Sequence, residues 1–158
     1  MRYLIPILYI SACQLFADSA GDSQELEPIT VTATRFNELV NDVPHDVHLI
    51  DEIDILEDMP RSLPETFRSN PGVLVQKTAN GKGSPFIRGF TGFRNLLLID
   101  GIRLNNAAFR EGPNQYWATV DPLSASRVEL IKGQGSVLYG SDAIGGTVNV
   151  ITKNADPL

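Results

Sequence analysis

The stretch VELIKGQGSVLYGSDAIGGTVNVITK, residues 128–153, decides the fold of this chain. A short apolar strand runs into a turn rich in glycine, a helix of one or two turns follows, and a second strand closes the stretch. Five glycines, at positions 133, 135, 140, 145 and 146, mark backbone that must turn sharply or pack closely. The stretch therefore predicts two strands joined by a tight glycine loop.

These glycines do not match a nucleotide-binding loop. The dinucleotide fingerprint needs a third glycine where Leu138 stands, and a phosphate loop needs a Gly-Lys-Ser/Thr run that this stretch lacks. The glycine loop is therefore expected to be structural.

The bulk composition suits one small exported domain. The chain has 158 residues, 42 % of them hydrophobic, and a formal charge of −6. Arg2 precedes the short apolar run Tyr3–Ile10, and small residues follow up to Ala17, which is the order of a secretory signal peptide. We therefore expect residues 1–17 to be removed as a signal peptide. The apolar run is too short to be a membrane span, which needs about 20 apolar residues.

Cys13 is the only cysteine, and it allows two interpretations. It is either an incidental residue of the removed peptide or, because Ile10–Cys13 resembles a lipobox, a lipid anchor. Neither allows a disulfide within one chain, so the domain must be held together by packing.

The charge is divided unevenly along the chain. Residues 18–60 contain 12 acidic residues and one basic residue, whereas residues 61–158 contain 11 basic and 7 acidic residues. We expect a flexible acidic leader over residues 18–42 and a folded domain over residues 43–154. The positive charge is too scattered to indicate nucleic-acid binding.

The leader contains one segment with the pattern of a strand, Glu27–Arg35. Ile29, Val31 and Ala33 alternate with threonines, and Pro28 prevents pairing at its start. A tethered extended segment can add a strand to the sheet edge of a partner protein. The same pattern also fits the first strand of the domain, and composition does not separate the two.

The remaining pattern predicts short elements in an α/β (α+β-like) domain. We expect a strand at 46–50, a helix capped by Asp51 with Ile53 and Leu56 on its apolar side, and a helix from the capping box at Ser62 to Ser69. Asp100-Gly101 predicts a hairpin between an apolar central strand and residues 102–105.

No catalytic, metal or cofactor site is expected. His45 and His48 would lie on opposite faces of an extended segment, and neither a carboxylate nor a cysteine completes a metal site. No Gly-x-Ser-x-Gly elbow is present, so the sequence does not predict a hydrolase.

Six short motifs in order resemble the plug domain of TonB-dependent outer-membrane receptors, over residues 27–153. They are Asn70–Val73, Ile87–Gly89, Leu98–Gly101, Val128–Gly133, Leu138–Gly140 and Gly145–Ile151. The resemblance implies a small mixed β-sheet flanked by short helices with long loops.

The resemblance also implies a location and partners. A plug fills the lumen of an outer-membrane β-barrel of about 22 strands, and its N-terminal segment faces the periplasm. Residues 27–35 resemble a TonB box, which assigns TonB binding to Ile29, Thr30, Val31, Thr32 and Ala33. The transported substrate would be scarce: a ferric siderophore, haem, cobalamin or a similar molecule.

The sequence lacks the strands of a barrel, so we expect a receptor fragment or a truncated product. The alternative is a stand-alone exported binding domain with a plug-like fold.

We expect side chains of an irregular loop to contact the substrate, because hydrogen-bond donors and aromatic rings suit an anionic or planar ligand. They are Arg110, Asn114, Gln115, Tyr116 and Trp117, with Lys82 and Ser84 second. Packing of Tyr116 and Trp117 is the equally open alternative. The resemblance gives Arg88, Arg103 and Arg127 with Glu129 a structural role, either between plug and barrel or within the sheet.

Overall fold

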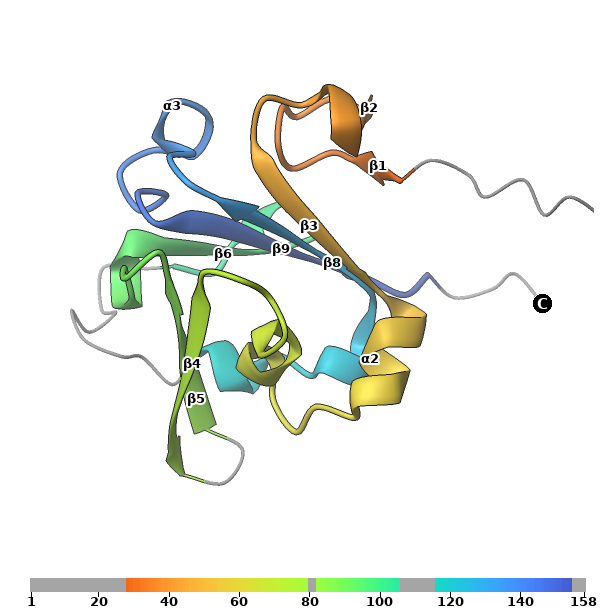
Figure 1. Cartoon of the computed structure of the whole chain (residues 1–158), viewed down its shortest axis with the longest axis vertical. Helices are drawn as coiled ribbons and strands as arrows, with labels where there is room; N and C mark the ends of the chain where they lie inside the picture. The colour runs from red at the N-terminus through yellow and green to blue at the C-terminus, as the bar shows by residue number, and fades with distance from the viewer. Residues whose placement is uncertain (1–27, 80–81, 106–115, 155–158) are drawn as a thin grey trace, which may run out of the picture.

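The computed structural model describes residues 28–79, 82–105 and 116–154. Its centre is a five-stranded sheet in the order β3-β8-β9-β6-β7 (Figure 1). The strands are β3 (Asp46–Asp51), β8 (Ala125–Lys132), β9 (Gly146–Thr152), β6 (Asn95–Ile99) and β7 (Ile102–Arg103). The two strands of the glycine-rich stretch, β8 and β9, therefore lie side by side in the middle of the sheet.

The sheet is mixed. β9 pairs antiparallel with β8 and parallel with β6, while β3–β8 and β6–β7 are antiparallel. Because side chains alternate between the faces of a strand, Val128 and Leu130 point to one face while Glu129 and Ile131 point to the other. Glu129 lies directly opposite Asn149 of β9. The expectation of a small mixed sheet with short helices is confirmed.

The Asp-Gly hairpin is also confirmed. Asp100 and Gly101 have φ angles of 49° and 79°, the positive values that a type I′ turn requires. β6 lies between β9 and β7, as expected of a central strand, and Leu96, Leu97 and Leu98 are buried while Ile99 is half-buried. The turn is attached to β9, because the Asp100 carboxylate accepts hydrogen bonds from the Thr152 amide and hydroxyl, both at 2.8 Å.

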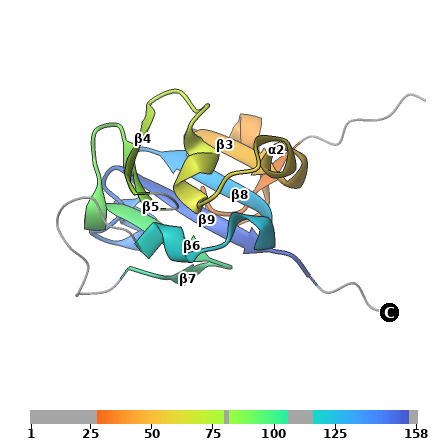
Figure 2. The same ribbon diagram turned by 90° about the horizontal axis from the view of Figure 1, so that it is seen from below.

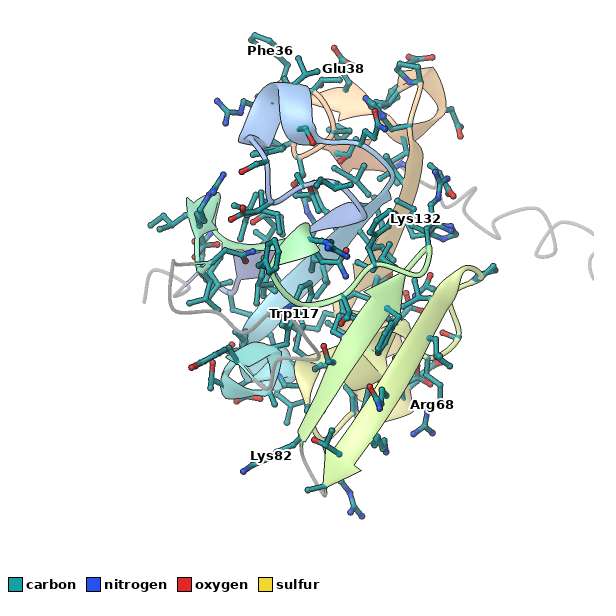
Figure 3. The ribbon with its side chains drawn as sticks, turned by 90° about the vertical axis from the view of Figure 1, so that its left-hand side faces the viewer. Phe36, Glu38, Arg68, Lys82, Trp117 and Lys132 are labelled. Atoms are coloured by element: carbon teal, nitrogen blue, oxygen red, sulfur yellow. The ribbon has the colours of Figure 1, made fainter. Side chains whose placement is uncertain are left out.

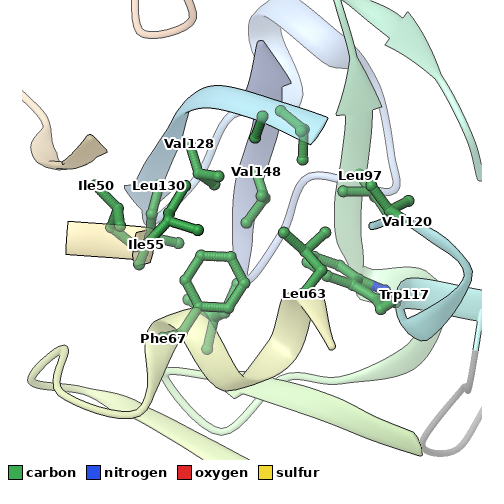
Figure 4. Close-up of a cluster of buried hydrophobic side chains, with 13 residues drawn as sticks. Ile50, Ile55, Leu63, Phe67, Leu97, Trp117, Val120, Val128, Leu130 and Val148 are labelled. Atoms are coloured by element: carbon green, nitrogen blue, oxygen red, sulfur yellow. The ribbon is translucent and has the colours of Figure 1, made fainter. Parts of the chain in front are cut away.

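The main hydrophobic core covers the face of the sheet that carries Val128 and Leu130. Its cover comprises α2 (Glu52–Asp58), the 3-10 helices η3 (Leu63–Phe67), η5 (Tyr116–Thr119) and η6 (Pro122–Ser124), and the hairpin of β4 (Val73–Ala79) and β5 (Lys82–Ile87) (Figure 2). In Figure 4, Phe67 and Trp117 lie beside Leu63 against the sheet. A further 3-10 helix, η4 (Gly92–Arg94), leads into β6.

Two local predictions need correction. Asp51 and Asp54 form the expected reciprocal cap of α2, but the helix buries Ile55, whereas Ile53 and Leu56 are 66 % and 50 % exposed. The segment after Ser62 is a 3-10 helix that ends at Phe67, and the Ser62 side chain makes no capping hydrogen bond. The first difference arises because contact with the core, rather than the local pattern, selects the buried side of a helix.

The N-terminal part of the described chain covers the opposite face of the sheet. It contains β1 (Ile29–Thr30), β2 (Glu38–Leu39) and η2 (Val40–Asp42), close to α3 (Ser136–Tyr139) at one end of the molecule (Figure 1). Ala33 and Val43 pack on Ile131 of β8. Residues 28–42, which the sequence places in a flexible leader, thus contact the sheet; the domain boundary at 43 stays a prediction, and the predicted signal peptide lies outside the described residues.

Among the described residues, no helix has the length and apolar character needed to cross a membrane. The same residues contain no group of histidine, cysteine or carboxylate side chains that could hold a metal ion.

Candidate partner-binding segment

The predicted partner-binding residues 29–33 form a short strand followed by a turn. Only Ile29 and Thr30 are in a strand, paired antiparallel with Leu39 and Glu38 of β2. From Val31 the backbone bends, and the Arg35 amide donates to the Val31 carbonyl at 2.8 Å. The extended run expected from the alternating pattern therefore ends at Thr30, because the chain folds back onto the sheet.

The threonine side of this segment faces inward. Thr30 and Thr32 are buried, whereas Ile29 is 45 % exposed and Val31 is half-buried. An aliphatic side would normally be the buried one. The reason for the reversal is that the sheet presents the polar side chains of Glu129 and Asn149 to Thr30 and Thr32, whereas Ala33 is buried on Ile131.

The central polar side chain is Glu129 of β8, which is completely buried. Its Oε2 accepts three hydrogen bonds: from the Thr30 hydroxyl at 2.9 Å, the Val31 amide at 3.2 Å and the Thr32 amide at 2.9 Å. Its Oε1 lies 3.1 Å from the Arg127 guanidinium. A buried carboxylate is costly unless it is paired and hydrogen-bonded, and here the donors come mainly from segment 29–33.

Two further side chains hold Thr32. Asn149 of β9 donates to the Thr32 hydroxyl at 2.9 Å, and the Tyr139 hydroxyl donates to the Thr32 carbonyl at 2.8 Å. Burial raises the pKa of Tyr139, with a smaller contribution from Glu129 and opposition from Arg35, so its hydroxyl remains a donor at neutral pH. The Arg35 guanidinium stacks on the Tyr139 ring at 4.8 Å.

Sequence reasoning missed this anchoring site. It gave Glu129 a structural role with Arg127, and that ion pair is present. The available signal was an acidic residue at the centre of an apolar strand. Its partners could not be identified, because Thr30 and Thr32 lie 99 and 97 residues away along the chain.

Of the predicted substrate-contact residues, the structure describes four, and they lie on β5 and η5, which contact each other. Arg110, Asn114 and Gln115 lie outside the described residues. Trp117 is 1 % exposed and packs edge-on against Phe67 with 6.4 Å between ring centroids, so packing is the interpretation that the structure supports for it.

The other members of this set also differ in exposure. Ser84 is buried and shares a hydrogen bond of 3.0 Å with Thr91. Tyr116 and Lys82 are exposed. Lys82 lies at the opposite end of the molecule from Phe36 and Glu38 (Figure 3).

The three arginines with a predicted structural role pair with carboxylates of this chain. Arg88 contacts Asp46 at 3.3 Å, Arg103 contacts Asp142 at 3.1 Å, and Arg127 contacts Glu129. Arg103 also donates to the Tyr139 carbonyl. These pairs join distant segments of the domain.

Asp46 belongs to a second charged cluster, at the start of β3. Its carboxylate lies 3.1 Å from the buried Lys132 ammonium, 3.3 Å from Arg88 and 3.2 Å from His48. Lys132 also donates to the Pro71 carbonyl at 3.0 Å. Partial burial tends to raise the pKa of Asp46, but the hydrogen bond and charge of Lys132, with His48 and Arg88, together hold it below its ordinary value of 3.8.

Asp46→Asn is therefore expected to reduce stability in a pH-dependent manner. Because the folded-state pKa lies below the unfolded value, the carboxylate stabilises the fold above about pH 4, and this contribution disappears as pH falls through the lowered pKa. The side chain is 43 % exposed, so we expect a loss of about 1 kcal/mol at pH 7.

Urea unfolding from pH 7 down to pH 3 measures this difference. The difference in free energy of unfolding between the wild type and Asp46→Asn should become smaller toward the acidic end. Glu57→Gln, at an exposed position of α2, is the control. A gap that stays constant over the whole range would contradict the assigned pairing.

Comparison with known proteins identifies the fold. The model of the TonB-dependent receptor plug domain family matches residues 40–147. The vitamin B12 transporter BtuB of Vibrio vulnificus (strain CMCP6) is 35 % identical over 156 residues, which cover 97 % of this chain and 24 % of that protein. The chain thus spans about a quarter of the length of the curated relatives that it matches.

Solved receptor structures agree with this match. FpvA of P. aeruginosa bound to a heterologous pyoverdine–iron complex has a TM-score of 0.67 at 25 % identity, covering 80 % of this chain and 16 % of that chain. The ferric enterobactin receptor PfeA of Pseudomonas aeruginosa, in complex with enterobactin, has a TM-score of 0.55 at 29 % identity, covering 71 % and 18 %. Since the family model matches most of the chain and the fold is similar to that of these receptors, the protein belongs to the TonB-dependent receptor plug domains, which are receptor domains and not enzymes.

Proposed function

We propose that this chain is the plug of an outer-membrane receptor that takes up a scarce substrate with energy supplied through TonB. Segment 29–33 is the site that TonB engages, from the periplasm, and the pairing is between main chains. The plug occupies the lumen of the receptor's β-barrel and closes it until TonB acts.

The position of segment 29–33 carries this proposal. The segment lies at one end of the molecule, outside the five-stranded sheet, and only its two-residue strand pairs with β2. Exposed Lys82 of the β4–β5 hairpin lies at the other end (Figure 3). Separate ends for the TonB segment and a substrate-facing surface are what a plug between two compartments needs.

Cobalamin is the first substrate to test. The Vibrio vulnificus relative, 35 % identical, is a vitamin B12 transporter, while the solved structures noted above bind pyoverdine–iron and enterobactin. A ferric siderophore or haem is the second choice. Tyr116 and Lys82 are the described side chains proposed to face the substrate.

Uptake of radiolabelled substrate tests the proposal directly. Residues 28–154 replace the plug of a vitamin B12 transporter, and cobalamin, a ferric siderophore and haem are offered to cells with and without TonB. We expect cobalamin uptake that requires TonB. Equal uptake by cells with and without TonB would reject the proposed role. TonB-dependent uptake of a ferric siderophore or haem instead of cobalamin would identify that molecule as the substrate.

A further inference from the structure

We infer that His48 is a pH-sensitive switch that changes its hydrogen-bond partner between Lys132 and Asp46, and that this exchange alters how the β4–β5 hairpin is held on the sheet. The inference rests on contacts within this chain and does not depend on the proposed function. It gives the charged cluster at the start of β3 a role beyond stabilising the fold.

The first support is that one ring nitrogen of His48 lies within reach of two partners. His48 Nε2 is 2.7 Å from the Lys132 ammonium and 3.2 Å from the Asp46 carboxylate. A lysine ammonium only donates hydrogen bonds, and an ionised carboxylate only accepts them. Nε2 must therefore be unprotonated to bind Lys132 and protonated to bind Asp46, so the protonation state of the imidazole selects the partner.

The second support is the arrangement around Lys132. Its ammonium has three hydrogens, and it has three acceptors: His48 Nε2, the Pro71 carbonyl at 3.0 Å and Asp46 Oδ2 at 3.1 Å. The Lys132 side chain is only 5 % exposed, so water does not readily replace a lost acceptor. Protonation of His48 removes one acceptor and places a second positive charge beside the ammonium, so Lys132 must move away from the ring.

Among the described residues, the charged groups that face His48 come from three segments. Asp46 lies on β3 itself, Lys132 comes from β8, and Arg88, directly after β5, reaches the Asp46 carboxylate at 3.3 Å. Loop 70–72 contributes a carbonyl and has no charged side chain. One carboxylate therefore balances two cations while the imidazole is neutral, and three cations once the imidazole is protonated.

The third support is that the cluster holds both ends of the β4–β5 hairpin. Lys132 binds the carbonyl of Pro71, two residues before β4 begins. Asp46 binds Arg88, the residue after the end of β5. The two ends also contact each other, because the Arg88 amide donates to the Gly72 carbonyl at 3.0 Å. A change in the partners of Lys132 and Asp46 therefore reaches the base of the hairpin.

NMR spectroscopy of the imidazole nitrogens in the full chain, labelled with nitrogen-15, tests the neutral state. Long-range spectra distinguish a protonated ring nitrogen from an unprotonated one. At about pH 8 we expect His48 Nε2 to be unprotonated with the proton on Nδ1, and at about pH 5 we expect both nitrogens to be protonated. A proton on Nε2 at the alkaline end would overturn the inference, because that nitrogen would then donate to Asp46 in both states.

Backbone amide signals at the base of the hairpin test the consequence. Between about pH 8 and about pH 5, the signals of Gly72 and Arg88 should shift with the same midpoint as the His48 ring. Asp46 stays ionised over this range, because its pKa lies below 3.8. His48→Gln should abolish the shift, since a glutamine carbonyl can accept from Lys132 but does not gain a proton.

The other histidine provides the matched control. His45 is exposed and lines a pocket with Ile131, on the sheet face opposite Lys132. His45→Gln should therefore leave the pH-dependent shifts of Gly72 and Arg88 unchanged.

Two results would overturn the inference at this step. In the first, the Gly72 and Arg88 signals of the wild type do not follow the His48 titration. In the second, their shifts persist in His48→Gln or disappear in His45→Gln. The ring spectra of the wild type need no variant, so they still decide the matter if His48→Gln does not fold.

Discussion

Replacing Trp117 with alanine is expected to lower the free energy of unfolding by about 3–5 kcal/mol, the range for truncating a large buried aromatic side chain. Trp117 is 1 % exposed and packs edge-on against Phe67, 81° out of its plane, in the main core. A domain of this size has a total stability of about 5–15 kcal/mol, and it has no disulfide to limit the loss. Urea unfolding followed by circular dichroism measures the change.

The adjacent residue provides the matched control. Tyr116 belongs to the same 3-10 helix but is 43 % exposed, so Tyr116→Ala should cost well under half as much. If Trp117 were instead a substrate contact outside the core, the two variants would unfold at similar urea concentrations. That result would favour Trp117 as a substrate contact over Trp117 as a core residue.

Val31→Pro is expected to reduce TonB-dependent uptake at least tenfold, equivalent to about 1.4 kcal/mol of binding free energy. Proline removes the backbone N–H that a sheet partner needs. The measurement is radiolabelled cobalamin uptake by the vitamin B12 transporter that carries residues 28–154 in place of its own plug. The control is Val31→Ala in the same receptor, which changes the side chain but keeps the amide.

Two effects of this substitution oppose each other. The Val31 amide also donates to Glu129 at 3.2 Å, so proline also weakens the contact of segment 29–33 with the sheet. Two other donors, the Thr30 hydroxyl and the Thr32 amide, still bind that carboxylate, so the loss of pairing with TonB should dominate. Uptake that is unchanged in Val31→Pro, or equally reduced in Val31→Ala, would argue against main-chain recognition.

Local chemistry accounts for the parts of the fold that the sequence predicted correctly. Asp100-Gly101 specifies its hairpin because few residues accept two consecutive positive φ angles. Asp51 and Asp54 cap α2 because both partners lie within one turn of the chain. The buried face of α2 was predicted wrongly, since Ile53, Ile55 and Leu56 are all apolar and only contact with the core selects Ile55.

The candidate site also has features that the local sequence predicts and features that only tertiary contacts decide. The sequence marked residues 29–33 as a β-prone strip, and they remain the proposed TonB segment. It could not show that Trp117 and Ser84 are buried, because an irregular polar loop and a core contact look alike in sequence.

By itself, the sequence determined the two central strands, the glycine loop between them, the Asp-Gly hairpin and the plug family, because each depends on residues close together or on motifs in a fixed order. Only the tertiary structure decided that Glu129 binds Thr30, Val31 and Thr32. That contact joins residues nearly 100 positions apart along the chain. It exists because the sheet places an acidic side chain on the face opposite the main core, where the folded-back segment supplies most of the donors that satisfy it.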